Sequence, residues 1–355
     1  MRVLLVRAES SGGIGVHVDN LTRGLREAGH DVDTLVAGGT AAIPAIRHAA
    51  RRSAVDVVHA HGLRAGAAAC LATRKRTVVT LHNAPSNRAG ELLLRLIAQR
   101  ADVVLGASHD LVDLAVRHGA ADVRFAPVVA PALPPPRDTF PALKAGLRGE
   151  LGLGPDDRRP LVLAVGRLAL QKDYDTLLTA LTIMQDRYGA DGVPPVAIAG
   201  EGPRRAALQA VIDRRRLPVT LLGHRADIAD LLRAADVFVL CSVWEARPLA
   251  LQEALRAGVR HVIATDVGGV AEVTAGRVPL LPAHDSEALA EALRRACAPD
   301  ADPDADPDAG PDADPDAEPD GGLEQDPAPS ATDWDALWPG PADELAAALD
   351  AYQRS

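Results

Sequence analysis

The sequence predicts an α/β fold with two Rossmann-like, doubly wound domains, because three observations agree. Short runs rich in Val, Leu and Ile alternate with stretches of helical apolar spacing, a pattern typical of βα units and parallel sheets. The 355 residues exceed one ordinary α/β core and suit two domains of about 150 residues each. Aromatic residues make up only 3% of the chain, so aliphatic side chains must fill the cores, as in buried parallel sheets.

Each half of the chain supplies six runs that we expect to form strands. Those of the first half are Val3–Val6, Val32–Val36, Val55–His59, Val78–Leu81, Val103–Leu105 and Val123–Val129. Those of the second half are Leu161–Val165, Val196–Ala199, Val219–Leu222, Val237–Leu240, Val262–Ala264 and Val278–Leu281. Between them, Pro131–Pro136 can continue neither a strand nor a helix, because proline lacks the N–H group. We therefore expect one domain over residues 1–140 and another over 141–298.

The net charge of -10 comes from one segment near the end of the chain. Residues 1–150 carry an excess of basic residues, whereas residues 300–326 hold many acidic residues and no Lys or Arg. This Asp-Pro-Asp-Ala repeat has too little apolar surface to offset its ordering entropy, so residues 299–330 are expected to be disordered. Residues 331–355 then end in a helix with acidic residues in its first turn, expected to pack back on the domains.

Cysteine usage and hydropathy indicate a reduced protein that stays in the cytoplasm. Cys70, Cys241 and Cys297 are odd in number and widely spaced, which disfavours a disulfide framework or a zinc cluster. No run of about 20 apolar residues could span a membrane. Met1–Val6 lacks the long apolar centre and the cleavage site of a signal peptide.

Glycines and histidines follow the expected strands of the first half. Gly13 lies in the turn Ser10–His17, which opens a helix, and such turns either bind an anion or only need small residues. The spacing of these glycines differs from the dinucleotide-binding motif Gly-x-Gly-x-x-Gly. The interpretation as an NAD-binding site therefore lacks its main motif. His59, His61 and His82 end two strands and can converge on one crevice, although His59 also suits a structural role. Because no partner of suitable spacing accompanies this His-x-His pair, we predict no metal.

A set of cations and glycines follows the expected strands of the second half. Gly166 and Arg167 end the first of these strands, and Lys172 follows in the same loop. Two fixed cations beside a close backbone approach suit a leaving diphosphate, on which negative charge develops. Gly202 lies in a further strand-to-helix turn, Gly200–Pro203, of the kind that favours anions.

Two carboxylates complete this set. Glu245 stands in a loop after a strand, and Pro248 suits the first turn of a helix that carries Glu253. Carboxylates so placed can bind hydroxyls at separate points of one extended ligand. Glu245 or Glu253 alone would be interpreted as an ordinary surface acid. Together with Arg167 and Lys172, the two acids are better interpreted as part of a binding site.

In their order along the chain, these motifs resemble the retaining glycosyltransferases of family 4, which have the GT-B fold of two domains facing across a cleft. The resemblance covers nearly the whole chain outside the acidic segment. The motifs that carry it are Gly12-Gly13 with His17, Gly29–Val32, Asp56–Gly62, Ser108, Gly166–Leu168 with Gln171-Lys172, Gly200–Pro203, Ala235–Val237, Glu253–Gly258, Gly268-Gly269 and the Glu-x7-Glu spacing of Glu245 and Glu253.

The resemblance implies a nucleotide-diphosphate sugar as co-substrate and a role for each matching residue. Arg167 and Lys172 would hold the diphosphate, Glu253 the ribose hydroxyls and Glu245 a hydroxyl of the transferred sugar. His82 would lie beside the reacting carbon. The remaining donor-binding positions would be Gly13, which approaches the diphosphate from the other domain, together with Gly166, Gly202 and Leu249.

The activity that the resemblance implies is a hexosyltransferase that retains the anomeric configuration. Such enzymes look metal-independent, with the leaving phosphate taking the proton of the acceptor and the two cations replacing a metal. The acceptor is left open between a small molecule, a glycan and a lipid. Two alternatives are a non-catalytic GT-B protein that binds a nucleotide sugar or a partner, and a sugar-nucleotide epimerase of the same fold.

The chain departs from the family pattern at two places. The family usually has Glu-Gly-Phe-Gly-Leu where this chain reads Glu245-Ala246-Arg247-Pro248-Leu249. Pro248 removes a backbone N–H that could have bonded a sugar hydroxyl, which leaves the identity of the sugar open. The usual Asn-Gly after the last strand of the first domain is replaced by Pro127-Val128-Val129.

Basic runs in the first half suggest a peripheral contact with a membrane. Arg51-Arg52 and Arg74–Arg76 would face anionic lipid headgroups near a lipid acceptor, or would simply be solvated. Nucleic acid is not expected as a partner, because no aromatic residue lies among these cations.

Overall fold

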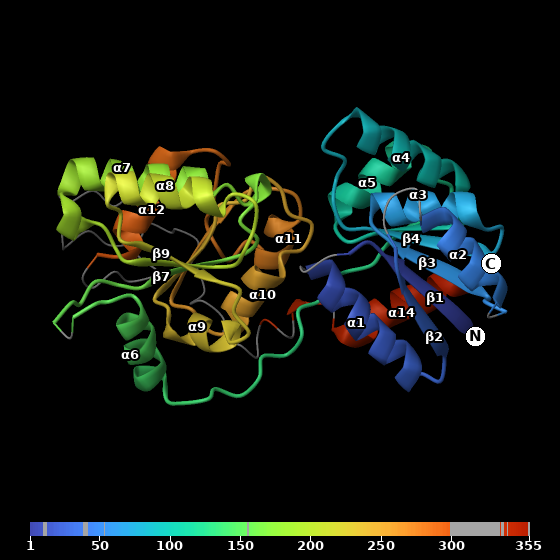
Figure 1. Cartoon of the computed structure of the whole chain (residues 1–355), viewed down its shortest axis with the longest axis horizontal. Coiled ribbons are helices and arrows are strands. Elements are labelled where there is room, and N and C mark those ends of the chain that lie inside the picture. The colour runs from blue at the N-terminus through green and yellow to red at the C-terminus, as the bar shows by residue number, and fades with distance from the viewer. Residues whose placement is uncertain are drawn as a thin grey trace, which may run out of the picture.

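The computed structural model describes residues 1–9, 13–37, 42–52, 54–154, 156–298, 334, 337–338 and 340–353. The disorder predicted for residues 299–330 lies outside the described residues. Figure 1 shows two α/β lobes side by side, each built around a central sheet. Both sheets have six strands, all parallel, which confirms the predicted fold class.

The first sheet has the strand order β2-β1-β3-β4-β5-β6. Its strands are β1 (Arg2–Arg7), β2 (Asp31–Val36), β3 (Val57–His61), β4 (Arg76–Leu81), β5 (Val103–Gly106) and β6 (Val123–Phe125). The helices between them are α1 (Gly13–Glu27), α2 (Ala42–Arg52), α3 (Leu63–Ala72), α4 (Arg88–Arg100) and α5 (His109–Arg117). Parallel neighbours need such helical crossovers, which cover both faces of the sheet.

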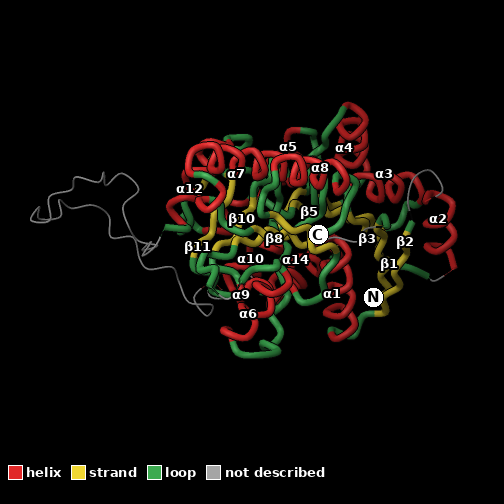
Figure 2. The backbone as a smooth tube through the Cα atoms, turned by 60° about the vertical axis from the view of Figure 1, so that its left-hand side comes forward, coloured by secondary structure: helices red, strands yellow, loops and turns green. Residues whose placement is uncertain are grey.

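The second sheet has the order β12-β11-β10-β7-β8-β9. Its strands are β7 (Val162–Val165), β8 (Val196–Ala199), β9 (Val219–Gly223), β10 (Val237–Leu240), β11 (His261–Thr265) and β12 (Leu280–Leu281). The helices of this domain are α6 (Phe140–Glu150), α7 (Tyr174–Tyr188), α8 (Arg205–Arg215), α9 (Ile228–Ala234), α10 (Leu249–Arg256), α11 (Val270–Thr274) and α12 (Ser286–Ala296), with short 3₁₀ turns η1 (Leu170–Lys172) and η2 (Ala190–Gly192). In Figure 2 helices surround the strands of both domains.

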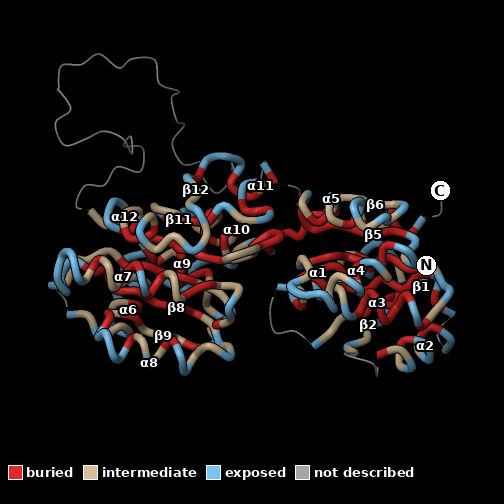
Figure 3. Tube along the Cα trace, turned by 90° about the horizontal axis from the view of Figure 1, so that it is seen from above, coloured by how far each residue is buried: buried red, intermediate tan, exposed pale blue. Residues whose placement is uncertain are grey.

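The central strands are buried along their length because helices cover both faces of each sheet. Every residue of β3 and of β10 is buried. Figure 3 shows buried residues along the sheets and exposed residues on the outer helices. A strand buried on both faces reads as a continuous apolar run rather than an alternating one, which is the signal that the sequence carries.

Each of the twelve expected runs overlaps a strand, but several expected boundaries differ, and two of the differences have a clear physical reason. β3 begins at Val57 instead of Val55, because pairing with β1 starts where Val3 faces Val57. Asp56 lies before that pairing and accepts a hydrogen bond from the Arg2 N–H at 2.7 Å. β6 ends at Phe125 instead of Val129, because Pro127 has no N–H to donate to a neighbouring strand.

The chain passes between the domains twice. After β6, residues 126–136 form neither helix nor strand, and the buried Gln252 of α10 holds them through Ala130 N–H at 3.0 Å and the Val128 carbonyl at 3.2 Å. On the way back, Trp338 packs in the second domain and donates to the Val273 carbonyl at 2.8 Å.

The last helix, α14 (Pro341–Tyr352), packs on the first domain beside α1, as Figure 1 shows. Arg76 of β4 donates to the carbonyls of Ala351 at 3.0 Å and Gln353 at 2.6 Å. The Tyr352 hydroxyl bonds His59 Nδ1 at 2.7 Å inside the core. No helix among those described is both long and apolar enough to cross a bilayer.

Replacing Tyr352 with Phe tests how firmly α14 is held. The substitution leaves a buried ring nitrogen of His59 unpaired, so the free energy of unfolding should fall by about 1–3 kcal/mol in urea denaturation. Tyr188→Phe is the matched control, because the Tyr188 side chain is exposed and should leave stability unchanged. Equal stability of both variants would contradict the docking of α14 through His59.

Candidate active site

The predicted site residues follow strands at the two places where the strand order reverses. In open parallel sheets, ligands bind at the carboxyl ends of the strands beside such a reversal. The first sheet reverses between β1 and β3, which lead to Gly13 and end at His61. The second reverses between β7 and β10, which lead to Gly166 and Glu245. Both sets therefore lie where this fold binds ligands.

A buried ion pair joins two of the predicted residues. Lys172 Nζ lies 2.5 Å from Glu245 Oε1, and the Ser242 hydroxyl donates to the same oxygen at 2.7 Å. The Lys172 and Glu245 side chains are only 18% and 10% exposed. Among the described residues, no hydrogen bond is formed by Oε2 of Glu245. One carboxylate oxygen is thus held in place and the other is available to a ligand hydroxyl.

The backbone around this pair is locked by Gln171. Its side-chain amide donates to the Trp244 carbonyl at 2.8 Å, and its own carbonyl accepts from the Val243 N–H at 2.9 Å. The loop after β7 therefore holds the loop after β10 directly. Side chains that bind a ligand need neighbouring residues that hold them in place. Gln171 is therefore a positioning residue for Lys172 and Glu245.

The glycines of the second domain serve close backbone approach. A Cβ on Gly166 would lie 3.0 Å from Lys172 Cε, so the glycine leaves room for the lysine side chain. A Cβ on Gly202 would lie 2.3 Å from the Leu168 carbonyl oxygen, so this glycine lets two loops pack against each other. Arg167, on the same loop as Gly166, is exposed and forms no ion pair with any described residue.

Glu253 lies on α10, the helix that follows the loop of Glu245. Burial raises the pKa of its carboxyl to about 7, with Arg256 acting weakly in the opposite direction. A carboxyl of this kind can be protonated or ionised near neutral pH, and ligand hydroxyls that donate to it favour the ionised form.

The loop between these two glutamates reaches across to the first domain. Ala246 is buried in the apolar cluster that contains Leu81, the residue before His82. A Cβ on Gly13 would lie 3.3 Å from Leu249 Cδ1, so Gly13 and Leu249 face each other. Trp244 Nε1 donates to Asp110 Oδ2 at 3.2 Å, at the start of α5. Gly13 and Leu249, predicted site residues of different domains, therefore meet at one interdomain junction.

Four buried histidines lie on the first-domain side of this junction. His61 Nδ1 is 3.2 Å from His82 Nε2, and their rings are stacked. The ring of His17 packs edge-on against both, with centroids 5.2 Å and 4.9 Å away. Burial, and then the neighbouring imidazoles, hold the pKa of His61 and of His82 well below 6.5. The same causes lower the pKa of His59 to about 3, so these three rings are neutral at physiological pH.

Two residues of α14 contact this histidine cluster. Glu344 Oε1 lies 2.8 Å from His17 Nδ1, and both side chains are buried. His59 is bonded on both ring nitrogens, by Tyr352 and by the Thr80 hydroxyl at 2.7 Å each, which is the structural role considered for it. Sequence reasoning missed Glu344 and Tyr352, because the spacing along the final helix says nothing of the domain on which it docks.

The histidines could also hold a metal ion. One ring nitrogen of each of His17, His61 and His82 lies within 4.8 Å of the others, and three imidazoles suit zinc. Two of these rings already bond each other, and His17 is engaged by Glu344. The absence of a metal from the reaction stays a prediction.

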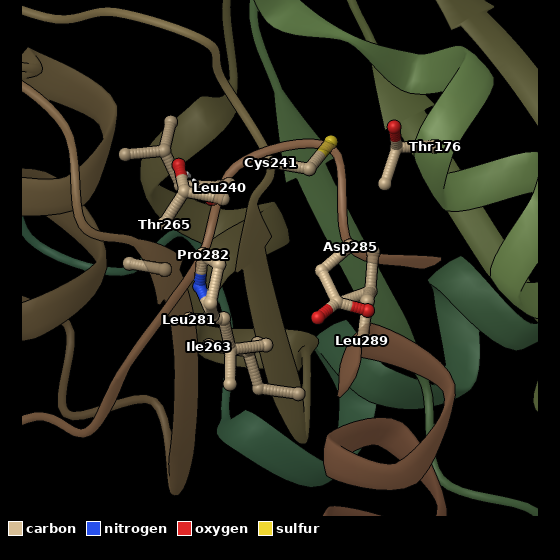
Figure 4. Close-up of a pocket in the computed structure, with 10 residues that line it drawn as sticks. Thr176, Leu240, Cys241, Ile263, Thr265, Leu281, Pro282, Asp285 and Leu289 are labelled. Atoms are coloured by element: carbon tan, nitrogen blue, oxygen red, sulfur yellow. Dashed lines mark hydrogen bonds between the residues drawn. The ribbon is translucent and has the colours of Figure 1, made fainter. Parts of the chain in front are cut away.

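Two cavities differ greatly in size. One of about 350 Å³ lies in the first domain beside the histidine cluster, and its lining includes Ile14, His61, Arg64, Asn83 and Leu93. The other, in the second domain near Cys241 and Thr176, measures only about 10 Å³ (Figure 4). The second can hold at most one water, since a water needs about 10–15 Å³. Only the first is large enough to receive a substrate group.

Two family models match the chain on either side of the interdomain linker. Residues 159–298 match the family described as Glycosyl transferases group 1, and residues 35–131 match a Glycosyl transferase 4-like domain. The chain belongs to the group 1 glycosyltransferases. The solved structures that resemble this group 1 glycosyltransferase include sucrose-phosphate synthase from Thermosynechococcus elongatus, with a TM-score of 0.66, 19% identity and coverage of 83% of this chain and 89% of that one. Anabaena HepE in complex with UDP and glucose has a TM-score of 0.67 at 19% identity, covering 83% and 89% of the two chains.

Curated relatives of this group 1 glycosyltransferase are similar over part of their length. It is 31% identical over 254 residues to a putative teichuronic acid biosynthesis glycosyltransferase, TuaC, of Bacillus subtilis, covering 68% of this chain and 61% of that protein. It is 29% identical over 216 residues to the lipopolysaccharide core mannosyltransferase LpsB of Rhizobium meliloti, covering 56% of each. The chain thus spans about three fifths of the length of these relatives.

The raised pKa of Glu253 predicts a pH-dependent loss of stability. The carboxyl ionises near 4.5 in the unfolded chain and at about 7 in the folded one, so unfolding is favoured as pH rises through this window. The shift corresponds to about 3 kcal/mol. Glu253→Gln cannot ionise, so its stability relative to the unmodified protein should increase from pH 4.5 to 7.

Urea denaturation at a series of pH values measures this difference. The exposed Glu9→Gln is the control, and its difference from the unmodified protein should stay within about 0.5 kcal/mol across the range. A difference for Glu253→Gln that is the same at both ends of the window would disprove the raised pKa.

Proposed function

We propose that this chain transfers a sugar from a nucleotide-diphosphate sugar to an acceptor hydroxyl, with retention of the anomeric configuration and without a metal ion. The observation that carries the proposal is the buried Lys172–Glu245 pair, 2.5 Å apart, at the strand-order reversal of the second sheet. A cation and an acid held together there match a ligand that has a phosphate next to a sugar hydroxyl.

The nucleotide half of the donor would lie along the second domain. Arg167 is exposed and close in sequence to Lys172, and together they offer two positive charges to a diphosphate. Glu253 would accept hydrogen bonds from the ribose, and Glu245 Oε2 from the sugar. HepE holds UDP in one complex and the nucleotide sugar UDP-glucose in another, and that similarity supports a nucleotide sugar here.

The chemical step needs no base from the protein. Lys172 and Arg167 stabilise the charge that builds on the terminal phosphate as the bond between its oxygen and the anomeric carbon breaks. The acceptor hydroxyl then bonds the same face of that carbon, and its proton passes to the departing phosphate oxygen. Entry on the face of departure retains the configuration.

His82 contributes as a neutral ring. Its pKa lies well below 6.5, so no positive charge opposes the positive character that develops at the anomeric carbon. Its partner His61 reaches the cavity of the first domain, which is the natural place for the acceptor. Arg64 in that cavity, and the basic runs further along the domain, are compatible with an acceptor on an anionic membrane surface.

Removing either member of the ion pair should abolish turnover. In a panel of UDP-, GDP- and ADP-sugars, nucleotide release by Lys172→Ala and by Glu245→Ala should fall by about 10³-fold, the cost of losing one electrostatic contact of the transition state. EDTA should leave the rate unchanged, and the anomeric proton coupling of the product should match that of the donor.

The matched control is Lys144→Ala. Lys144 of α6 is also 2.5 Å from an acid, Asp236, but Asp236 precedes β10 and lies at the opposite end of that strand from Glu245. Its activity should equal that of the unmodified protein. Binding of a nucleotide sugar with no turnover of any donor would instead indicate a non-catalytic protein, and isomerised sugar in the absence of acceptor would indicate an epimerase.

The neutral state of His82 can be tested through the pH dependence. His82→Gln should lower kcat by about 10²-fold while KM for the donor stays within a few-fold, since the ring acts on the reacting carbon. In the unmodified protein, the His82 ring protons should show no titration in NMR spectra between about pH 6 and 8. A titration in that interval would mean that the ring is charged during turnover.

A further inference from the structure

Arg247 lies in the loop that closes the interdomain junction. It stands between Ala246, buried in the apolar cluster of the first domain, and Leu249, which faces Gly13. Its own side chain is only 3% exposed. A guanidinium has therefore been enclosed where the two domains meet, two residues from Glu245.

The enclosed charge is poorly compensated. The nearest carboxylate oxygen, Oε2 of Glu272, is 3.8 Å from Arg247 Nη1, too far for a hydrogen bond. Nε and Nη2 are buried and have no hydrogen-bond partner among the described residues. Burial lowers the pKa of Arg247, and the charge of Glu272 opposes this shift.

Glu272 also contacts His109. Its Oε1 accepts from the backbone N–H of His109 at 2.9 Å, and its buried Oε2 lies 3.0 Å from His109 Nδ1 but forms no hydrogen bond with a described residue. Both distances to His109, at the start of α5, are shorter than the 3.8 Å between Glu272 Oε2 and Arg247 Nη1. Glu272 therefore contacts His109 more closely than Arg247. A buried guanidinium with one long ion pair and two unbonded nitrogens is costly, which indicates that a further partner comes from outside the chain.

The geometry of the free nitrogens indicates what that partner is. Nε–H and one N–H of Nη2 project in parallel from one edge of the planar guanidinium, and this edge matches a carboxylate with two hydrogen bonds. The diphosphate of the donor already has Arg167 and Lys172. A sugar hydroxyl would satisfy only one of the two N–H groups and would leave the charge unpaired.

We propose that Arg247 binds the carboxylate of an acidic sugar, so that the preferred donor is a nucleotide-diphosphate hexuronic acid. This inference rests on the proposed function, because Glu245 is taken to bind the same sugar. The Nε–H and Nη2–H groups of Arg247 then make a contact with the carboxylate that a neutral hexose cannot make. It also accounts for an arginine in a loop where the related family usually has phenylalanine.

Matched donors test this directly. UDP-glucose and UDP-glucuronic acid differ only at C6, as do GDP-mannose and GDP-mannuronic acid, so each pair isolates the carboxylate from the choice of base. The unmodified protein should prefer the acidic member, in thermal-shift binding and in kcat/KM for nucleotide release, by about 100-fold. Arg247→Gln should remove that preference, and Arg247→Lys should keep part of it.

Three controls separate the possible results. Lys144→Ala should keep the preference, and unfolding curves of the Arg247 variants show whether they fold. Should Arg247→Gln fail to fold, the comparison rests on Arg247→Lys, which keeps the charge and loses the fork and should reduce the preference by about tenfold. A neutral donor that binds and turns over as well as the acidic one would overturn the role of Arg247 and leave the transferase proposal intact. Failure of every donor to bind would overturn both.

Discussion

The site depends on the contact that the loop from Trp244 to Leu249 makes with the first domain. Its backbone lies directly against Gly268-Gly269, where a Cβ on Gly268 would come within 2.0 Å of the Glu245 carbonyl oxygen. Gly268 also has φ +52°, a conformation that L side chains rarely adopt. Any larger residue would push the loop away, and with it Glu245 and Arg247. The two glycines therefore determine the geometry of the junction.

The fold was predictable because local and global signals agree. In β10, four consecutive apolar residues are all buried, and in β3 even the two histidines are. Sheets covered on both faces give continuous apolar runs, and these are readable without knowing the partner strands. Strand ends were less predictable, since the start of β3 depends on which residue of β1 faces Val57. That register is a property of two segments and cannot be read from one.

The site was predictable as far as its residues follow strands. Lys172 and Glu245 are 73 positions apart, and only the rule that ligands bind at strand-order reversals brings them together in advance. Glu344 and Tyr352 were not predictable, because they reach the histidines through a helix that docks on the distant domain. Arg247 stood out in the sequence only as a departure from a familiar motif. Its burial without a partner is a tertiary fact, and it turns that departure into a chemical requirement.

Charge balance across the closed junction explains why these features occur together. Glu245 is already paired with Lys172, and burial lowers the pKa of His59, His61 and His82 so that these rings are neutral. Arg167 forms no ion pair with a described residue, and Arg247 is paired with Glu272 only at 3.8 Å, so positive charge is in excess at the junction. Under the proposed function, a multiply charged donor would balance this excess, so closure of the domains and binding of the donor would favour each other. A neutral ligand would not balance this positive charge and would favour domain closure less. The protein would then select its donor before any bond is broken.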